Sequence, residues 1–219
     1  MKVPKLVASA VAALLSVSVW AQTIPLPPTF KVGDSWTVRV TDALNDGQNR
    51  VRNATLKVER IAEGRVELVA HGPESTGLSR VLTMDGNVVR RGATDFEPEI
   101  RRFSYPLEPG KSWSVRFSYI ASELNRVEVA LNATVVGWEE VKVPAGTFRA
   151  MKLTYDGHWD LSISYRSGGG FGAPGGPVKQ TAWYVPEVKR LVRLERKSWR
   201  GAKLGVDEVE ELVAYHVEN

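Results

Sequence analysis

Residues 151–166 read MKLTYDGHWDLSISYR and alternate between two kinds of side chain. The odd positions carry Met, Leu, Tyr, Gly, Trp, Leu, Ile and Tyr, and the even positions are polar or charged. Successive side chains of a β-strand point to opposite faces, so this pattern predicts one face on a core and one in water. Strands of a parallel sheet that are covered on both faces read as continuous apolar runs, so the alternation favours an antiparallel sheet.

The same alternation recurs at residues 36–41, 112–119 and 127–135, with turn signals at 45–47, 63–64, 85–87, 109–110 and 145–146. We therefore expect one all-β domain over residues 22–219, with a mainly antiparallel curved sheet of about ten to twelve strands. A sandwich and an incompletely closed barrel both fit this expectation. Residues 207–212 are expected to form one or two helical turns, before the alternation returns at Val213.

An internal repeat is suggested by residues 30–40, FKVGDSWTVRV, and residues 107–117, LEPGKSWSVRF. The offset is 77 residues, and it also places Val58 on Val135. Self-similarity at a fixed spacing predicts duplicated units, here about 30–70 and 107–147. The alternative is convergence on a good turn into a strand. Both explanations predict that Trp36 and Trp113 begin strands, point inward and are mostly buried.

The N-terminus predicts export. Residues 1–5 carry two lysines, residues 6–20 are apolar or small, and Ala21 closes a small-x-small site. This combination is typical of a cleaved signal peptide over residues 1–21. We expect a periplasmic or secreted bacterial protein that is not integral to the membrane. Without this segment 27 basic and 25 acidic residues remain, interspersed along the chain, which argues against a nucleic-acid-binding surface.

Two further motifs carry a resemblance. Residues 143–153, VPAGTFRAMKL, and residues 183–195, WYVPEVKRLVRLE, resemble a pattern of exported bacterial all-β families of unknown function. The resemblance implies an all-β fold and a periplasmic location, and it implies no particular activity. The glycine-rich segment 168–176 departs from the pattern, and we expect it to be a mobile loop between two strands.

Catalytic and metal chemistry find little support in the sequence. The absence of cysteine excludes disulfides and thiolate chemistry, and no nucleophile elbow occurs. Asp156, His158 and Asp160 are ligand-type residues at positions i, i+2 and i+4, which share one strand face and could bind a metal, but a solvated face explains them better. We expect no catalytic residue, no metal and no cofactor.

Three functional hypotheses remain. The first is a non-catalytic envelope protein that binds an apolar or amphipathic, lipid-like ligand in a β groove. The second is an interaction or assembly module that contacts another envelope protein through sheet edges or the glycine-rich loop. The third is an enzyme with an unrecognised site. For the first, the candidate groove residues are the inward aromatic and aliphatic positions, namely Trp36, Trp113, Phe117, Tyr119, Tyr155, Trp159 and Ile163.

Overall fold

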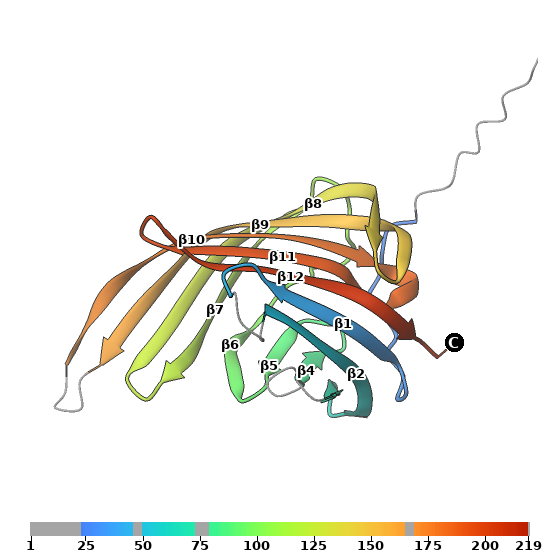
Figure 1. Cartoon of the computed structure of the whole chain (residues 1–219), viewed down its shortest axis with the longest axis horizontal. Helices are drawn as coiled ribbons and strands as arrows, with labels where there is room; N and C mark the ends of the chain where they lie inside the picture. Colours follow the sequence, from blue (N-terminus) through green and yellow to red (C-terminus); the bar gives the residue numbers. More distant parts are fainter. Residues whose placement is uncertain (1–22, 46–49, 73–78, 165–168, 219) are drawn as a thin grey trace, which may run out of the picture.

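The computed structural model describes residues 23–45, 50–72, 79–164 and 169–218. In this part of the chain, antiparallel strands dominate (Figure 1). Their bounds are β1 Ser35–Asp42, β2 Val51–Ala62, β3 Arg65–His71, β4 Arg80–Thr83, β5 Val88–Arg91, β6 Thr94–Ile100, β7 Ser112–Ser122, β8 Asn125–Val143, β9 Gly146–Ser164, β10 Gly170–Val185, β11 Arg190–Arg200 and β12 Lys203–His216. A 3-10 turn, η2, Pro186–Val188, joins β10 to β11 at the proline that the sequence places there.

The strands close into a barrel in which each pairs with its neighbours in sequence and β12 returns to β1. The closing pair runs from Ser35 opposite His216 to Asp42 opposite Glu208. Bulges in several ladders add local bend and twist, which help a sheet to curve onto itself. The all-β antiparallel expectation is confirmed, and the alternatives of a sandwich or an incomplete barrel are replaced by a closed barrel.

One junction of the barrel is held mainly by side chains. β6 and β7 are paired only at Glu97 and Ser118, which we call the seam. The Ser118 hydroxyl donates a hydrogen bond to the Glu97 carbonyl at 3.0 Å. Beside it, the ring of Phe96 packs edge-on against Phe117 and Tyr119, with centroids 5.6 and 5.7 Å away. These side-chain contacts supplement the short backbone pairing at the seam. Other neighbouring strands, such as β8 and β9, are paired over almost their whole length.

Two hydrophobic clusters fill much of the barrel interior. The first contains Trp36, whose indole N–H donates to the Val188 carbonyl at 2.8 Å. The second contains Tyr155, whose hydroxyl donates to the Arg102 carbonyl at 2.8 Å. Arg102 belongs to the segment between β6 and β7, in which Leu107 is fully buried. This connection therefore packs into the interior and narrows the space that remains there.

The two stretches that suggested a repeat form the same local structure. Gly33 and Gly110 both have positive φ, 102° and 86°, which glycine adopts without strain. Their N–H groups donate to the carbonyls of Val58 and Val135 at 3.0 and 2.8 Å, so the 77-residue offset holds for both partners. Each turn then leads into a strand, β1 or β7. Common ancestry of the two halves stays a prediction.

The two repeat tryptophans differ in burial. Trp36 is 1% exposed, whereas Trp113 is half-buried against the second cluster and donates to the Arg101 carbonyl at 2.9 Å. Both tryptophans are therefore mostly buried, as expected, but only Trp36 is completely enclosed.

Two local expectations are wrong. Residues 170–176 of the glycine-rich segment belong to β10, and Gly170 to Ala173 pair with β9. Residues 207–212 lie within β12 and form no helical turn. In the first case Gly175 and Gly176 lie where the backbone of β10 comes very close to those of β9 and β11, and this packing outweighs their conformational entropy.

Candidate functional site

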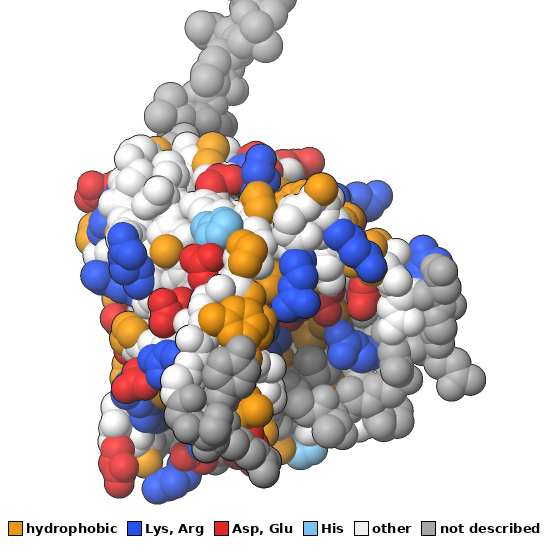
Figure 2. Space-filling view, turned by 90° about the vertical axis from the view of Figure 1, so that its left-hand side faces the viewer, with side chains coloured by type: hydrophobic (Ala, Val, Ile, Leu, Met, Phe, Trp, Pro, Cys, Tyr) orange, Lys and Arg blue, Asp and Glu red, His pale blue; other side chains and the backbone are white. Residues whose placement is uncertain are grey.

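A cavity of about 850 Å³ lies inside the barrel toward one end. Its lining residues come from the strands β5 to β12 and from Arg102 in the β6–β7 connection. Figure 2 faces this end of the molecule, where hydrophobic and basic side chains surround a hollow. The two hydrophobic clusters fill other parts of the barrel, so the strands leave space where their ends splay apart (Figure 1).

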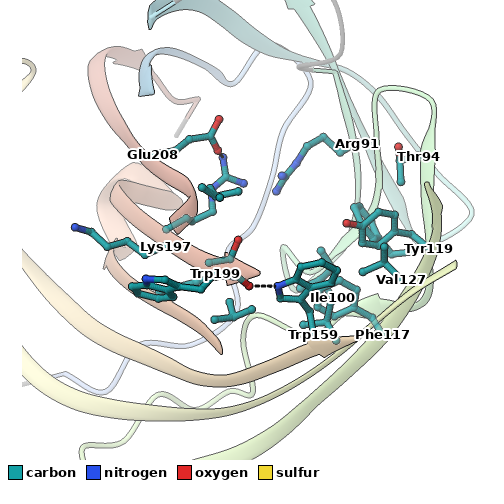
Figure 3. Close-up of a pocket in the computed structure, with 18 of the residues that line it drawn as sticks. Arg91, Thr94, Ile100, Phe117, Tyr119, Val127, Trp159, Lys197, Trp199 and Glu208 are labelled. Carbon is teal, nitrogen blue, oxygen red and sulfur yellow. Dashed lines mark hydrogen bonds and ion pairs between the residues drawn. The ribbon is translucent and has the colours of Figure 1, made fainter. Parts of the chain in front are cut away.

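One wall of the cavity is apolar (Figure 3). The side chains drawn together there come from the β6 end, β7, β8 and β9, and they are Ile100, Phe117, Tyr119, Val127 and Trp159. Burial raises the pKa of the Tyr119 hydroxyl above its usual value, and the nearby Arg91 opposes that shift. The neutral phenol therefore presents a mainly apolar ring and one hydrogen-bonding group.

The glycine-rich segment helps to build this wall. The indole N–H of Trp159 donates to the Trp199 carbonyl at 2.8 Å, which ties β9 to β11 across β10 (Figure 3). A Cβ at Gly175 would collide with the Trp159 carbonyl, and one at Gly176 would collide with the Trp199 carbonyl. Only glycine allows the backbones to approach so closely at these positions.

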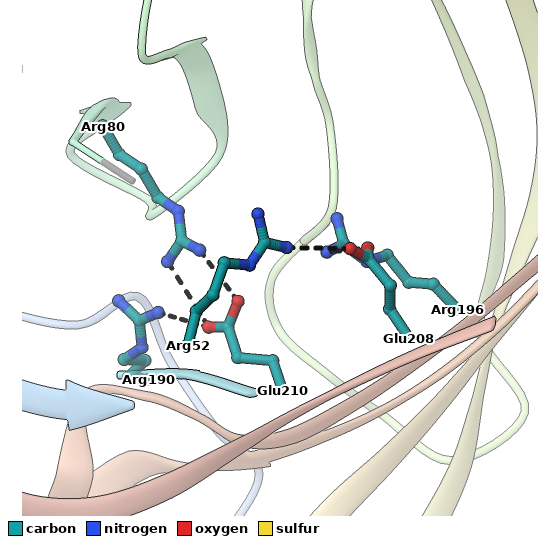
Figure 4. Close-up of polar contacts among 6 residues, drawn as sticks. All are labelled: Arg52, Arg80, Arg190, Arg196, Glu208 and Glu210. Atoms are coloured by element: carbon teal, nitrogen blue, oxygen red, sulfur yellow. Dashed lines mark hydrogen bonds and ion pairs between the residues drawn. The ribbon is translucent and has the colours of Figure 1, made fainter. Parts of the chain in front are cut away.

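A cluster of charged side chains lies beside the cavity (Figure 4), and two of its members, Arg196 and Glu208, line it. Glu210 of β12 binds Arg80 of β4 at 2.8 Å and Arg190 of β11 at 2.6 Å. Since β4 and β12 are not neighbours in the barrel, the pair with Arg80 crosses the interior. Glu208, also on β12, binds Arg52 at 3.2 Å and Arg196 at 2.7 Å.

The arginines determine the ionisation of Glu210. Burial alone would raise the pKa of its carboxyl, but Arg80, Arg190 and Arg196 outweigh that effect and hold the pKa well below its usual range. Burial, with repulsion from Arg80, lowers the pKa of Arg190 to about 10. Both groups are therefore charged near neutral pH, and the fixed Glu210 carboxylate is unsuited to supply a proton as a general acid.

Two arginines at the cavity lack an acidic partner. Within the described residues, Arg91 and Arg102 form no ion pair, and both line the cavity. Burial lowers the pKa of each, and repulsion from Arg80 and Arg196 adds to it. The Nε atom of Arg91 is buried without a hydrogen-bond partner. The interior thus holds more positive than negative charge.

The seven residues predicted for a groove are divided among three environments. Phe117, Tyr119 and Trp159 line the cavity. Trp36 and Tyr155 are buried in the hydrophobic clusters, and Trp113 packs against the second. Ile163 is half-buried on β9 and is not among the lining residues. The basic residues of the cavity were not predicted.

Other predicted features lie outside the barrel interior. Asp156, His158 and Asp160 are exposed on β9, and His158 pairs with Asp160 at 3.2 Å. The described residues include no group of three or more ligand side chains arranged to hold a metal ion. Within that same part of the chain, no helix has the length and apolar character needed to cross a membrane. The predicted signal peptide, residues 1–21, lies outside the described residues.

The basis of the assembly hypothesis also changes. The strands that the structure describes form a closed barrel, in which the seam between β6 and β7 is the junction with the least backbone pairing. The described residues of the glycine-rich segment from Gly170 onward are a strand of that barrel. Neither a long bare sheet edge nor a loop at these residues is therefore present as a docking surface in the described part of the chain.

Comparison with known proteins identifies the fold. Neither a protein-family model nor a curated protein matches the chain. A solved structure from Parabacteroides distasonis, described as a lipoprotein, is similar at a TM-score of 0.50 and 16% identity, over 89% of this chain and 100% of that one. A protein from Bacteroides fragilis, described as exported with a YmcC-like fold, is similar at a TM-score of 0.48 and 18% identity, over 88% of this chain and 99% of that one. The hypothetical lipoprotein YmcC from Escherichia coli is similar at a TM-score of 0.46 and 7% identity, over 83% of this chain and 84% of that one. The chain shares its overall fold with the Parabacteroides distasonis protein.

Proposed function

We propose that this protein is a non-catalytic, extracytoplasmic binding protein that holds an amphipathic molecule in the barrel cavity. The observation that carries the proposal is the cavity itself, about 850 Å³ with an aromatic and aliphatic wall facing a charged one. Pockets for small molecules typically measure about 300–1,000 Å³ and combine an apolar lining with a few polar groups.

Export is part of the proposal. The N-terminal pattern ending at Ala21 is typical of a signal peptide. Structural neighbours described as an exported protein and as lipoproteins agree with an extracytoplasmic location. An apolar ligand that must cross an aqueous compartment needs a protein to cover its chain, because each exposed CH₂ group costs about 0.8 kcal/mol.

The test is a titration with an anthracene-labelled fatty acid, followed by the quenching of tryptophan emission. Trp159 and Trp199 both line the cavity and should report binding. We expect saturable binding at micromolar probe. A protein that shows no saturable quenching, while a thermal melt proves it folded, would contradict the proposal.

A matched pair of variants locates the site. Val129→Phe places a larger ring in the cavity and should weaken probe binding about tenfold, a loss of about 1.4 kcal/mol. Val136→Phe makes the same change on the same strand at a side chain that is exposed, and it should leave binding unchanged. Equal effects of the two variants would place the binding elsewhere.

A further inference from the structure

The unpaired arginines point to the chemistry of the ligand's headgroup. Resting on the proposed function, we infer that the cavity selects amphiphiles with an anionic head, a carboxylate or a phosphate, and that Arg91 and Arg102 bind that head. The acyl chain then lies along the wall formed by Phe117, Tyr119 and Trp159.

The first argument is the charge inside the barrel. Six arginines, Arg52, Arg80, Arg91, Arg102, Arg190 and Arg196, surround two glutamates, Glu208 and Glu210. The four ion pairs involve Arg52, Arg80, Arg190 and Arg196, and each carboxylate is shared by two of them. Buried charges are ordinarily paired, so this excess of cations is costly unless an anion joins it.

The second argument is the unused hydrogen-bonding capacity of the arginine side chains. A guanidinium offers five N–H donors in a fixed plane that matches a carboxylate or phosphate with two parallel bonds. The side chains of Arg91 and Arg102 form no hydrogen bond to an acceptor among the described residues. A headgroup placed between them would supply the missing acceptors and the missing negative charge together.

The third argument is the position of the arginines relative to the apolar wall. In Figure 3, Arg91 extends toward the interior on the side of Glu208, opposite the group formed by Phe117, Tyr119 and Trp159. A molecule with one charged end and one apolar end matches this division. A neutral amphiphile would leave the arginines desolvated, and a cationic one would meet repulsion.

The arrangement also explains why β5 carries two arginines in succession. Arg90 is exposed on the outer face, whereas Arg91 lines the cavity. A bulge around Val88–Arg90 in the pairing of β5 with β6 accompanies this placement. Arg90 therefore provides a control that removes the same charge from the same strand without touching the cavity.

The experiment compares three amphiphiles with the same chain, laurate, dodecyl phosphate and dodecanol, by isothermal titration calorimetry. The proteins are the wild type, Arg91→Gln and Arg90→Gln. The wild type should bind one or both anions at least tenfold more tightly than dodecanol. Arg91→Gln should weaken anion binding about ten- to hundredfold, the effect of losing a charge-assisted hydrogen bond, and should leave dodecanol unchanged. Arg90→Gln should change neither.

The outcomes separate the two proposals. Equal binding of anions and dodecanol, or an Arg91→Gln protein that keeps its preference for anions, would overturn the headgroup assignment and leave amphiphile binding intact. Binding of none of the three would overturn both. The relative affinities of laurate and dodecyl phosphate identify which anion the site prefers. A thermal melt provides a second readout, because removal of a half-buried cation without an acidic partner should leave the ligand-free Arg91→Gln protein at least as stable as the wild type. A clearly lower melting temperature would show that Arg91 has a structural role and would contradict the inference.

Discussion

Replacing Glu210 by Gln removes the single carboxylate that joins Arg80 and Arg190, while it keeps the size of the side chain and one acceptor oxygen. All three side chains are between 8% and 12% exposed, and the two contacts measure 2.8 and 2.6 Å. The variant would leave two guanidinium groups facing each other in the interior, close to the unpaired Arg91 and Arg102. Breaking a buried ion pair by removing one partner typically costs about 3–5 kcal/mol.

The assay is urea unfolding followed by tryptophan emission. With a slope near the upper end of the usual range, about 3 kcal/mol per M, that loss lowers the midpoint by about 1–2 M urea. Glu211→Gln is the control on the same strand. It pairs with Arg39 and Arg193 at 2.9 and 2.8 Å, but those side chains are 39% and 28% exposed, so we expect a loss of about 1 kcal/mol or less. Similar midpoints for the two variants would refute the argument from burial.

Three further results are expected. The pKa of Glu210 is lowered in the folded protein, so the stabilisation from its carboxylate is present above the unfolded pKa of about 4.3 and is lost as the pH falls through the folded pKa. Glu210→Gln lacks this titrating group, so its melting temperature, measured down to about pH 3, should fall less steeply than that of the wild type. Trp36→Ala should cost about 3–5 kcal/mol and Trp113→Ala about 1–2 kcal/mol, measured by far-ultraviolet circular dichroism in urea, and equal losses would contradict the difference in burial. Gly176→Ala forces a Cβ onto a backbone carbonyl of β11 and should cost about 1–3 kcal/mol or more in the same assay, whereas Gly172→Ala, with open space around it, should be neutral.

The strand content could be predicted because period-2 alternation records which face of a strand is buried. Residues 151–163 follow it closely, with Met151, Leu153 and Tyr155 buried and Asp156, His158 and Asp160 exposed. Closure of the barrel could not be predicted, because it depends on the pairing of β12 with β1, which are far apart in the sequence. No local pattern distinguishes a strand that closes a barrel from one that ends a sheet.

The cavity was predicted in part. Phe117, Tyr119 and Trp159 lie on inward rows that the alternation identifies. Glu210, which lies beside the cavity, was missed although it precedes the buried Leu212 by two positions and so shares its face, a signal that the sequence does contain. Arg91 gives no such signal. Strict alternation from the buried Val88 would turn Arg90 inward, and the bulge in the β5–β6 pairing breaks that alternation.

The seam between β6 and β7 has a consequence for how the molecule fluctuates. Phe96 lies on one side of this junction and Phe117 and Tyr119 on the other, and all three line the cavity. Separating the two strands breaks one bridge and a few ring contacts, whereas separating β8 from β9 would break a ladder that runs from Asn125 to Val143. Local openings follow the smallest loss of contacts, so amide hydrogens of β6 and the second half of β7 should exchange with solvent well before those of β8 and β9. Separation of β6 from β7 therefore changes the volume of the cavity and costs only a fraction of the free energy needed to unfold the barrel.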